Sequence, residues 1–212
     1  MAGTIRSTYR ASLRVNLQEV GTTEPWSDTD LNDYLEQATN EAANLLVDDA
    51  LQELFDLKLS QATVNGTDNY ALDSDALRVV WVKYNGKLAR MVGVSQIPLL
   101  DSNSFMTPSL TDPAAYVLNG KIYIKPTPGA TVPTYDYCFV KRPVWATGDG
   151  IANPLNDDKR NIVLYLAGAI AFGSDSVKLS EATIHRGLAE TAIKTLNDKF
   201  ERLKQRTGGL MR

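Results

Sequence analysis

Three Asn-Gly pairs, at Asn65-Gly66, Asn85-Gly86 and Asn119-Gly120, lie within about 55 residues in the middle of this 212-residue chain. Asn-Gly is a strong short-range signal for a tight β-hairpin, because both residues tolerate the positive φ angles that such turns require. The segments around the pairs alternate in hydrophobicity or are rich in β-branched and aromatic residues, as strands are. The middle of the chain is therefore predicted to form an antiparallel sheet of five or six strands.

The predicted strands are separated by turn residues and by one long irregular segment. That segment, Gln96–Pro113, contains three prolines and is predicted to be a loop with one short helix. Loops of this length in compact domains are often binding or assembly elements. The segments predicted to be extended are residues 57–64, 70–72, 77–84, 87–92, 115–118, 121–125 and 134–141.

The sequence before the sheet has the periodicity of an amphipathic helix. Apolar residues at helical spacing run from Leu31 to Leu54, and the opposite face is acidic. Ser27 or Asp28 is a suitable N-cap, and acids in the first turns suit the helix dipole. These features predict a helix over about Asp28–Leu57.

Two more helices are predicted after the sheet. The first runs to about Phe172, and its Ile162–Phe172 part is apolar on all sides, which indicates a core helix. At eleven residues this part is too short for a membrane span, which needs about 20. The second begins near Ser180 and ends at Gly208-Gly209. We therefore predict an α+β fold with a helical segment at 1–57, a β-rich lobe at 58–150, and a helix pair at 151–212 that packs on the first helix.

Charge is distributed unevenly along the chain. From Val15 to Leu57 there is no Lys or Arg, and eleven acids give the stretch a charge of −11. The remainder holds all 22 basic residues and the other 14 of the 25 acids, so it carries +8, and the whole chain carries −3. Opposed charge blocks suit contacts between subunits, or a surface that must repel an anion.

Two sets of charged residues are candidates for such contacts. The acidic face of the first long helix would repel an anion or meet a neighbouring subunit. A basic N-terminal stripe and the basic end of the last helix, together with the Gln96–Pro113 loop, would reach partners. The acidic set is Asp33, Glu36, Glu41, Asp48, Asp49 and Glu53; the basic set is Arg6, Arg10, Arg14, Arg202, Lys204 and Arg206.

Residues that could support catalysis are few. His185 is the only histidine, so a two-histidine metal site cannot form within one chain. Cys138 lies between aromatic residues of a predicted strand, as a buried thiol would. Acid pairs occur where helix caps and turns explain them, and no phosphate loop or nucleophile elbow occurs. We predict no catalytic residue, no metal site and no cofactor, and hence no enzyme.

The order of elements resembles that of a known protein class. A helix opens with Trp26-Ser27-Asp28-Thr29-Asp30-Leu31, and a hairpin-rich insert follows with Tyr70-Ala71-Leu72 and Leu77-Arg78-Val79-Val80. Pro154-Leu155 then leads into an apolar helix, a Gly173-Ser174 break and a long charged helix. This arrangement resembles the head-to-tail adaptor (connector) proteins of tailed bacteriophages, especially the tail-tube adaptor of short-tailed phages.

The resemblance implies a structural virion protein in the neck, assembled in the host cytoplasm. It implies a twelve-fold ring of identical subunits, with the portal protein above, a tail tube or nozzle protein below and double-stranded DNA passing through the lumen. No membrane is implied. A head-completion stopper or a tail terminator is the alternative within this class. A metal-dependent phage DNA-processing enzyme and an oligomeric binding module are alternatives of other classes.

Overall fold

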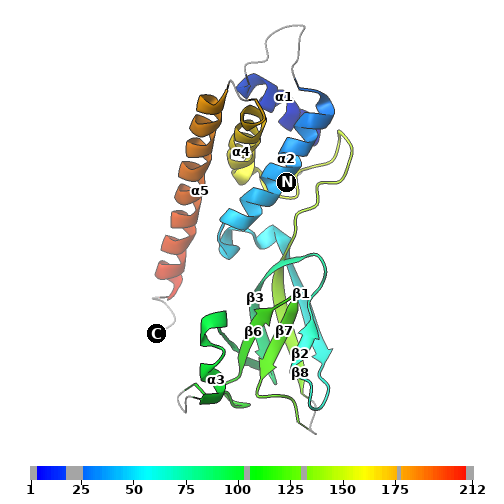
Figure 1. The fold of residues 1–212 in the computed structure, drawn as a ribbon, viewed down its shortest axis with the longest axis vertical. Coiled ribbons are helices and arrows are strands. Elements are labelled where there is room, and N and C mark those ends of the chain that lie inside the picture. The colour runs from blue at the N-terminus through cyan, green and yellow to red at the C-terminus, as the bar shows by residue number, and fades with distance from the viewer. Residues whose placement is uncertain (1–3, 18–25, 103–105, 130–132, 176–177, 209–212) are drawn as a thin grey trace. The chain divides into compact units, whose positions relative to one another are not determined.

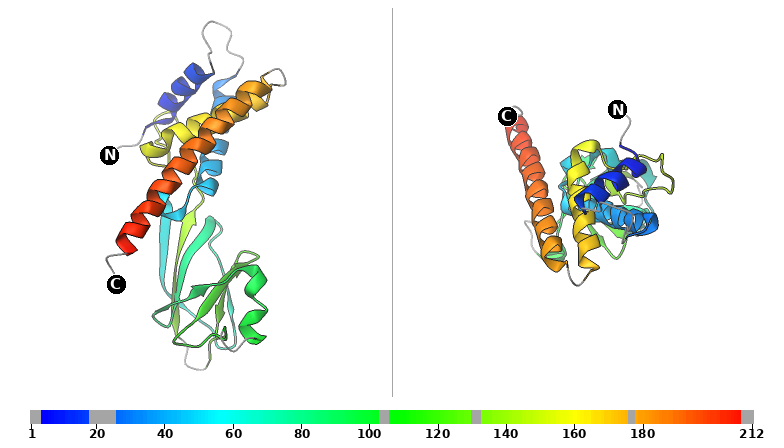
Figure 2. Two further views of the ribbon diagram at one scale, coloured as in Figure 1. Left: turned by 90° about the vertical axis from the view of Figure 1, so that its left-hand side faces the viewer. Right: turned by 90° about the horizontal axis from the view of Figure 1, so that it is seen from above.

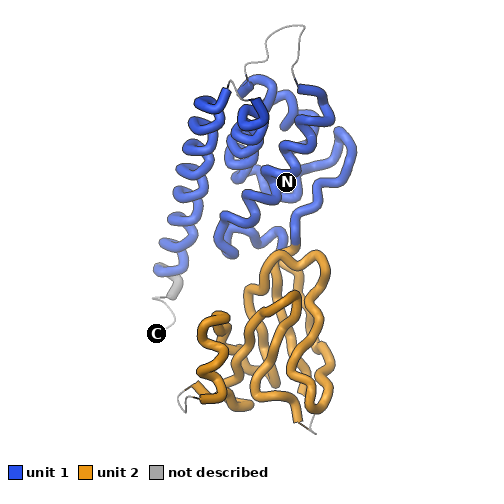
Figure 3. Tube along the Cα trace, viewed as in Figure 1, with its two compact units in different colours: residues 1–54, 142–212 blue, residues 55–141 orange. Residues whose placement is uncertain are grey.

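The computed structural model describes residues 4–17, 26–102, 106–129, 133–175 and 178–208, with backbone only for 206–208. The chain forms two compact units (Figure 3). One is helical and comprises residues 1–54 and 142–212; the other is β-rich and comprises residues 55–141. The α+β class with an inserted β lobe is thus confirmed.

The helical unit is built around its most apolar helix. That helix, α4, packs against three others, α1, α2 and α5 (Figures 1 and 2). Its side chains from Ile162 to Phe172 are mostly buried, as a segment apolar on all sides should be. The helices are α1 (Arg6–Asn16), α2 (Asp28–Leu45), α4 (Arg160–Gly173) and α5 (Leu179–Gly208), with short 3-10 turns η1 (Asp48–Ala50), η2 (Gln52–Leu54) and η4 (Asp157–Lys159).

The first long helix begins where the sequence predicts. Ser27 is the N-cap, and it forms a capping box in which its side chain and that of Asp30 each bond the other's backbone N–H. The buried residues of α2, among them Leu31, Leu35 and Ala38, keep the predicted helical period. Its N-terminus is therefore determined by local sequence.

The predicted end of that helix near Leu57 is wrong. The helix ends at Leu45, and Leu46 is already extended, with φ −81° and ψ 146°. Asn197 of α5 explains this end, because its amide donates to the carbonyl oxygen of Leu45 at 3.2 Å and accepts from the N–H of Val47 at 3.1 Å. The side chain of a residue about 150 positions away thus forms hydrogen bonds with the backbone groups at this helix end. In a longer helix, those groups would form hydrogen bonds within the helix.

The packing of α4 against α5 depends on a glycine. A Cβ atom on Gly168 would lie 2.5 Å from Nδ1 of His185, far closer than such atoms approach in proteins. The histidine ring also contacts the rings of Phe172 and Tyr165 edge to face. Ala189 and Ile193 continue the buried side of α5. The absence of a side chain at position 168 therefore permits the close approach of the two helices.

The β unit contains two four-stranded sheets, ordered β1-β8-β3-β4 and β2-β7-β6-β5. All described pairs are antiparallel except β5 with β6. The chain enters this unit in β1 and leaves in β8, and these two strands pair with each other, which brings the ends of the insert together. The strands are β1 (Phe55–Ala62), β2 (Asn69–Ala71), β3 (Ala76–Tyr84), β4 (Lys87–Leu88), β5 (Arg90–Met91), β6 (Ala114–Leu118), β7 (Lys121–Lys125) and β8 (Thr134–Lys141).

Aromatic side chains from both sheets fill the core of the β unit. Tyr135, Tyr137 and Phe139 alternate along one face of β8 and stack in sequence, with centroids 5.9 and 5.7 Å apart. Ile122 and Ile124 of the other sheet complete the same cluster and are fully buried. A smaller cluster lies beside the short helix α3 (Leu99–Ser102), which follows the 3-10 turn η3 (Val94–Gln96).

Two of the three predicted hairpins form. Asn85-Gly86 joins β3 to β4 and Asn119-Gly120 joins β6 to β7, with φ between 50° and 71° at all four residues. The hairpin predicted at Asn65-Gly66 is wrong, because the flanking strands β1 and β2 belong to different sheets. A single sheet of five or six strands is also wrong.

The return strand predicted at 87–92 divides between the sheets. Lys87–Leu88 pairs back on β3, whereas Arg90–Met91 pairs with β6. The conformation of a turn depends on about four consecutive residues, so the sequence predicted the position of this turn. The sheet that a strand joins depends instead on pairing with strands that are remote in sequence.

The β unit ends at Lys141, before the predicted boundary at position 150. The reason is Trp145, which is 2% exposed and packs edge to face on Tyr9 of α1 with centroids 5.0 Å apart. Its Nε1 donates to the carbonyl oxygen of Ile151 at 3.2 Å. The segment 142–153 thus belongs to the helical unit, and Trp145 anchors it there.

Candidate interaction surfaces

The arginines of α1 face inward. Arg6 is 3% exposed; its Nη2 donates to the carbonyl oxygen of Trp145 at 2.7 Å, and its guanidinium lies 5.0 Å from the centre of the Trp145 ring. The same nitrogen is 3.9 Å from a carboxylate oxygen of Glu36. A buried guanidinium requires such partners, because an unpaired charge is costly to bury.

The other two arginines of the stripe form ion pairs within the helical unit. Arg10 lies 2.8 Å from Asp149 and 3.6 Å from Asp28, and Arg14 lies 2.8 Å from Asp28. The hydrogen bond from Arg14 lowers the pKa of Asp28. The stripe therefore attaches α1 to α2 and to the segment 142–153. That these arginines also contact a partner remains a prediction.

Three of the six candidate acids form internal ion pairs. Glu36 faces Arg6, and Glu41 pairs with Arg186 of α5. Glu53 is the most enclosed of the three, since it lies 2.9 Å from Nζ of Lys159, which is 2% exposed. Much of the acidic block that the sequence shows is therefore neutralised by basic residues from other parts of the chain.

The remaining three candidate acids are also accessible to solvent. Asp33 is exposed on α2, and Asp48 and Asp49 are partly exposed in η1. Asp33 lines a hollow along α2, together with Glu36, Gln37, Asn40, Glu41, Asn44 and Ile170 of α4. The polar outer side of α2 and the C-terminal part of α4 thus form one concave surface.

A second hollow continues this surface toward α5. Ile170 lines both, so the two hollows meet over α4. The pair of Arg186 with Glu41 joins the helices on either side. The second hollow is lined by Ala169, Ile170, Leu179, Ala182, Thr183, Arg186, Gly187 and Glu190. We call the two hollows together the α2–α5 groove.

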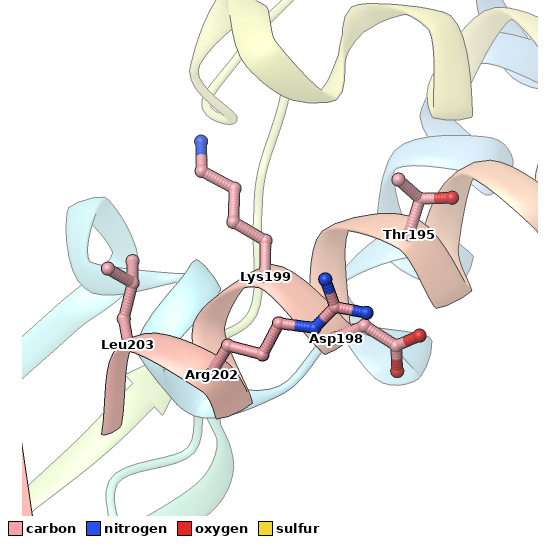
Figure 4. Close-up of a pocket in the computed structure, with 5 residues that line it drawn as sticks. All are labelled: Thr195, Asp198, Lys199, Arg202 and Leu203. Atoms are coloured by element: carbon pink, nitrogen blue, oxygen red, sulfur yellow. The ribbon is translucent and has the colours of Figure 1, made fainter. Parts of the chain in front are cut away.

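The basic end of α5 is exposed. Arg202 and Lys204 are both accessible to solvent, whereas the side chain of Arg206 lies outside the described part. Figure 4 shows Thr195, Asp198, Lys199, Arg202 and Leu203 projecting from this end, where they line a shallow hollow. These side chains, unlike that of Arg6, are exposed to solvent.

The region around the predicted long loop presents apolar side chains. Val94 is 61% exposed, and Leu99, Leu110 and Met91 are between 40% and 49% exposed. Sequence analysis missed this feature, because η3 and α3 are too short to show a periodic pattern. Its only signal was the length of the loop.

Of the two candidate reactive residues, His185 is partly buried and Cys138 is buried. His185 is in contact with aromatic rings of α4, and burial lowers its pKa. Cys138 is 5% exposed within β8. Among the described residues, no group of three or more His, Cys, Asp or Glu side chains could hold a metal ion. Nor is any helix in the described part long and apolar enough to cross a membrane.

A family model described as SU10 adaptor protein matches residues 6–210. The chain belongs to that family. The match runs from the start of α1 to beyond α5 and so includes both units. It confirms the resemblance to head-to-tail adaptor proteins of tailed bacteriophages. Comparison with curated proteins finds no match.

Membership of this family identifies a structural protein of the phage virion, located in the neck. It implies contacts with other head and tail proteins of the phage. The surfaces described above, rather than a catalytic cluster, are therefore the parts of the molecule from which its function is to be derived.

Proposed function

We propose that this chain forms a ring of twelve identical subunits that joins the portal to the tail tube or nozzle, and that the genome passes through its lumen. The observation that carries the proposal is the match to an adaptor family over residues 6–210, which spans both units. An adaptor between two ring-shaped assemblies must present one surface to each and a third to its own copies. The groove, the exposed end of α5 and the apolar side chains near α3 are candidates for these roles.

The accessible acids support passage of DNA without tight binding. DNA carries one negative charge per about 1.7 Å of duplex length, so a lumen lined with basic residues would hold it. Asp33 is exposed, and Asp48 and Asp49 are partly exposed. We infer that these three acids face the lumen or a neighbouring copy.

The proposal is tested by the mass and symmetry of the assembled protein. The full chain is incubated with and without purified portal rings of its own phage, and native mass spectrometry and negative-stain imaging follow. We expect a ring of twelve copies stacked on the portal. A protein that remains monomeric and does not bind the portal would overturn the proposal.

A stopper and a tail terminator would occupy neighbouring levels of the same neck. Addition of the tail tube or nozzle protein to the portal-bound ring separates the three possibilities, because an adaptor binds portal and tail protein at once. A nuclease assay with Mg²⁺ or Mn²⁺ tests the remaining alternative, a metal-dependent enzyme. Cleavage abolished by a chelator would contradict a purely structural role.

A further inference from the structure

Helix α5 has two flanks that face different neighbours. On one flank, Thr183, Arg186 and Glu190 line the α2–α5 groove. On the other, Glu181, Ile184 and His185 line a hollow with the end of α1. The buried side, which includes Ala189 and Ile193, lies between the flanks. One helix therefore offers two distinct surfaces, on opposite sides of its contact with α4.

The groove flank is concave and bordered by acids. Its lining includes the small residues Ala169, Ala182 and Gly187 beside the apolar Ile170. The charged residues that line it are Asp33, Glu36, Glu41, Glu190 and Arg186, with a formal charge of −3. A helix with apolar residues at its centre and basic residues beside them would complement this surface in shape and in charge.

The other flank has those properties. Ile184 is 61% exposed and Leu188 is 44% exposed, and at i and i+4 they form one apolar strip along the helix. Helical periodicity places Lys199 and Arg202 on the same side farther along, where both are exposed. Asp198 lies beside these two basic residues and lines the same hollow, and Glu181 is the acid at the other end of this side. We call this surface, residues 181, 184, 188, 195, 199 and 202, the α5 ridge.

We propose that the α5 ridge of one subunit docks into the α2–α5 groove of the next copy of this chain. This inference rests on the proposed ring and names the contact that closes it. Two different, complementary surfaces on opposite flanks produce a head-to-tail contact, which is the kind that generates rings; a single self-complementary patch would stop at a dimer. Burial of Ile184 and Leu188 supplies the apolar centre, and the acidic rim of the groove sets the register.

Cysteine cross-linking tests the pairing directly. Leu188→Cys marks the ridge and Thr183→Cys marks the groove, each in a separate full-length protein. The native Cys138 is 5% exposed, so the wild type serves as the background control. The variants are treated with a short bismaleimide, alone and as an equal mixture, on portal rings. Gln52→Cys, exposed and outside both surfaces, replaces Thr183→Cys in a matched control.

We expect covalent dimers from the mixture and none from either variant alone. Because each copy carries one accessible cysteine, the products stop at dimers. No dimer is expected when Gln52→Cys replaces Thr183→Cys. Dimers from Leu188→Cys alone would mean that ridges face ridges and would overturn the inference. So would rings that assemble from the mixture without any cross-link.

Untreated wild type, imaged in parallel, separates this inference from the proposed function. Wild-type rings without ridge-to-groove cross-links would contradict only the inference. Absence of wild-type rings on the portal would contradict both. A second variant, Leu188→Asp, places a charge in the apolar centre and should lower ring formation at least tenfold, while unchanged ring formation in that variant would also count against the inference.

Discussion

Helices α1 and α5 both carry basic residues at helical spacing, yet they are attached to the same core by different interactions. The arginines of α1 are directed inward, to Trp145, Asp149, Asp28 and Glu36. The contact of α5 with α4 instead depends on close packing at Gly168, and its basic end is exposed. Ion pairs of arginines thus contribute more to the attachment of α1, and close packing at a glycine contributes more to that of α5.

The difference shows that a row of basic residues along a helix does not by itself indicate a surface for a partner. Its role depends on whether acids from elsewhere in the chain lie opposite it. For α1, the acidic N-cap region of α2 and Asp149 provide such partners. Lys199 and Arg202 of α5, by contrast, are exposed to solvent. The predictions below test this contrast, beginning with the largest effect.

Removal of the Arg6 side chain should have the largest effect on stability. Arg6→Ala removes a buried charged hydrogen bond, a cation–π contact and the packing of the aliphatic stem. We expect the free energy of unfolding of the helical unit to fall by roughly 3–4 kcal/mol. Lys199→Ala is the matched control on α5 and should change it by less than about 0.5 kcal/mol. Urea denaturation followed by circular dichroism measures the free energy of unfolding of both variants. Equal losses in the two variants would contradict the difference between α1 and α5.

A methyl group at position 168 should weaken the attachment of α5. Gly168→Ala places Cβ against the ring of His185, and we expect a loss of about 2 kcal/mol, as for other overpacked cores. The double variant Gly168→Ala with His185→Ala should lose less than the sum of the two single changes, because the clash is gone. Additive losses in the same denaturation assay would mean that the two residues do not oppose each other.

The smallest expected effect is a dependence on pH. Burial lowers the pKa of His185 from its ordinary value near 6.5, so the unfolded chain binds a proton more readily than the folded one. Stability contributed by the neutral ring is thus present above pH 6.5 and is lost as pH falls below it. Glu181 in the same hollow titrates at lower pH, since its own pKa is lowered.

His185→Phe keeps an aromatic ring in this position and removes the titration. The wild type should lose stability as the pH falls below about 6.5, and the variant should show a flatter profile there. Thermal unfolding at a series of pH values measures the difference. Parallel profiles for the two proteins would assign the pH dependence to other groups.

Most of the local structure could be predicted from the sequence, because its causes lie within a few residues. The capping box of Ser27 and Asp30, the positive φ of Asn85 and Asn119, and the apolar α4 all follow from near neighbours. The candidate surfaces were less predictable. The sequence showed an acidic block but not that Lys159 and Arg186 would pair with two of its glutamates.

By itself, the sequence determined the fold class, the order of its elements, where α2 begins and where two hairpins turn. Only the tertiary structure decided that α2 ends at Leu45, where Asn197 caps it, and that the strands divide into two sheets. It also decided that Arg6 is buried and that Arg10 and Arg14 are partly buried, while the basic end of α5 is exposed. The physical reason is range: turn and cap chemistry acts over about four residues, whereas burial and ion pairing depend on groups that only folding brings together.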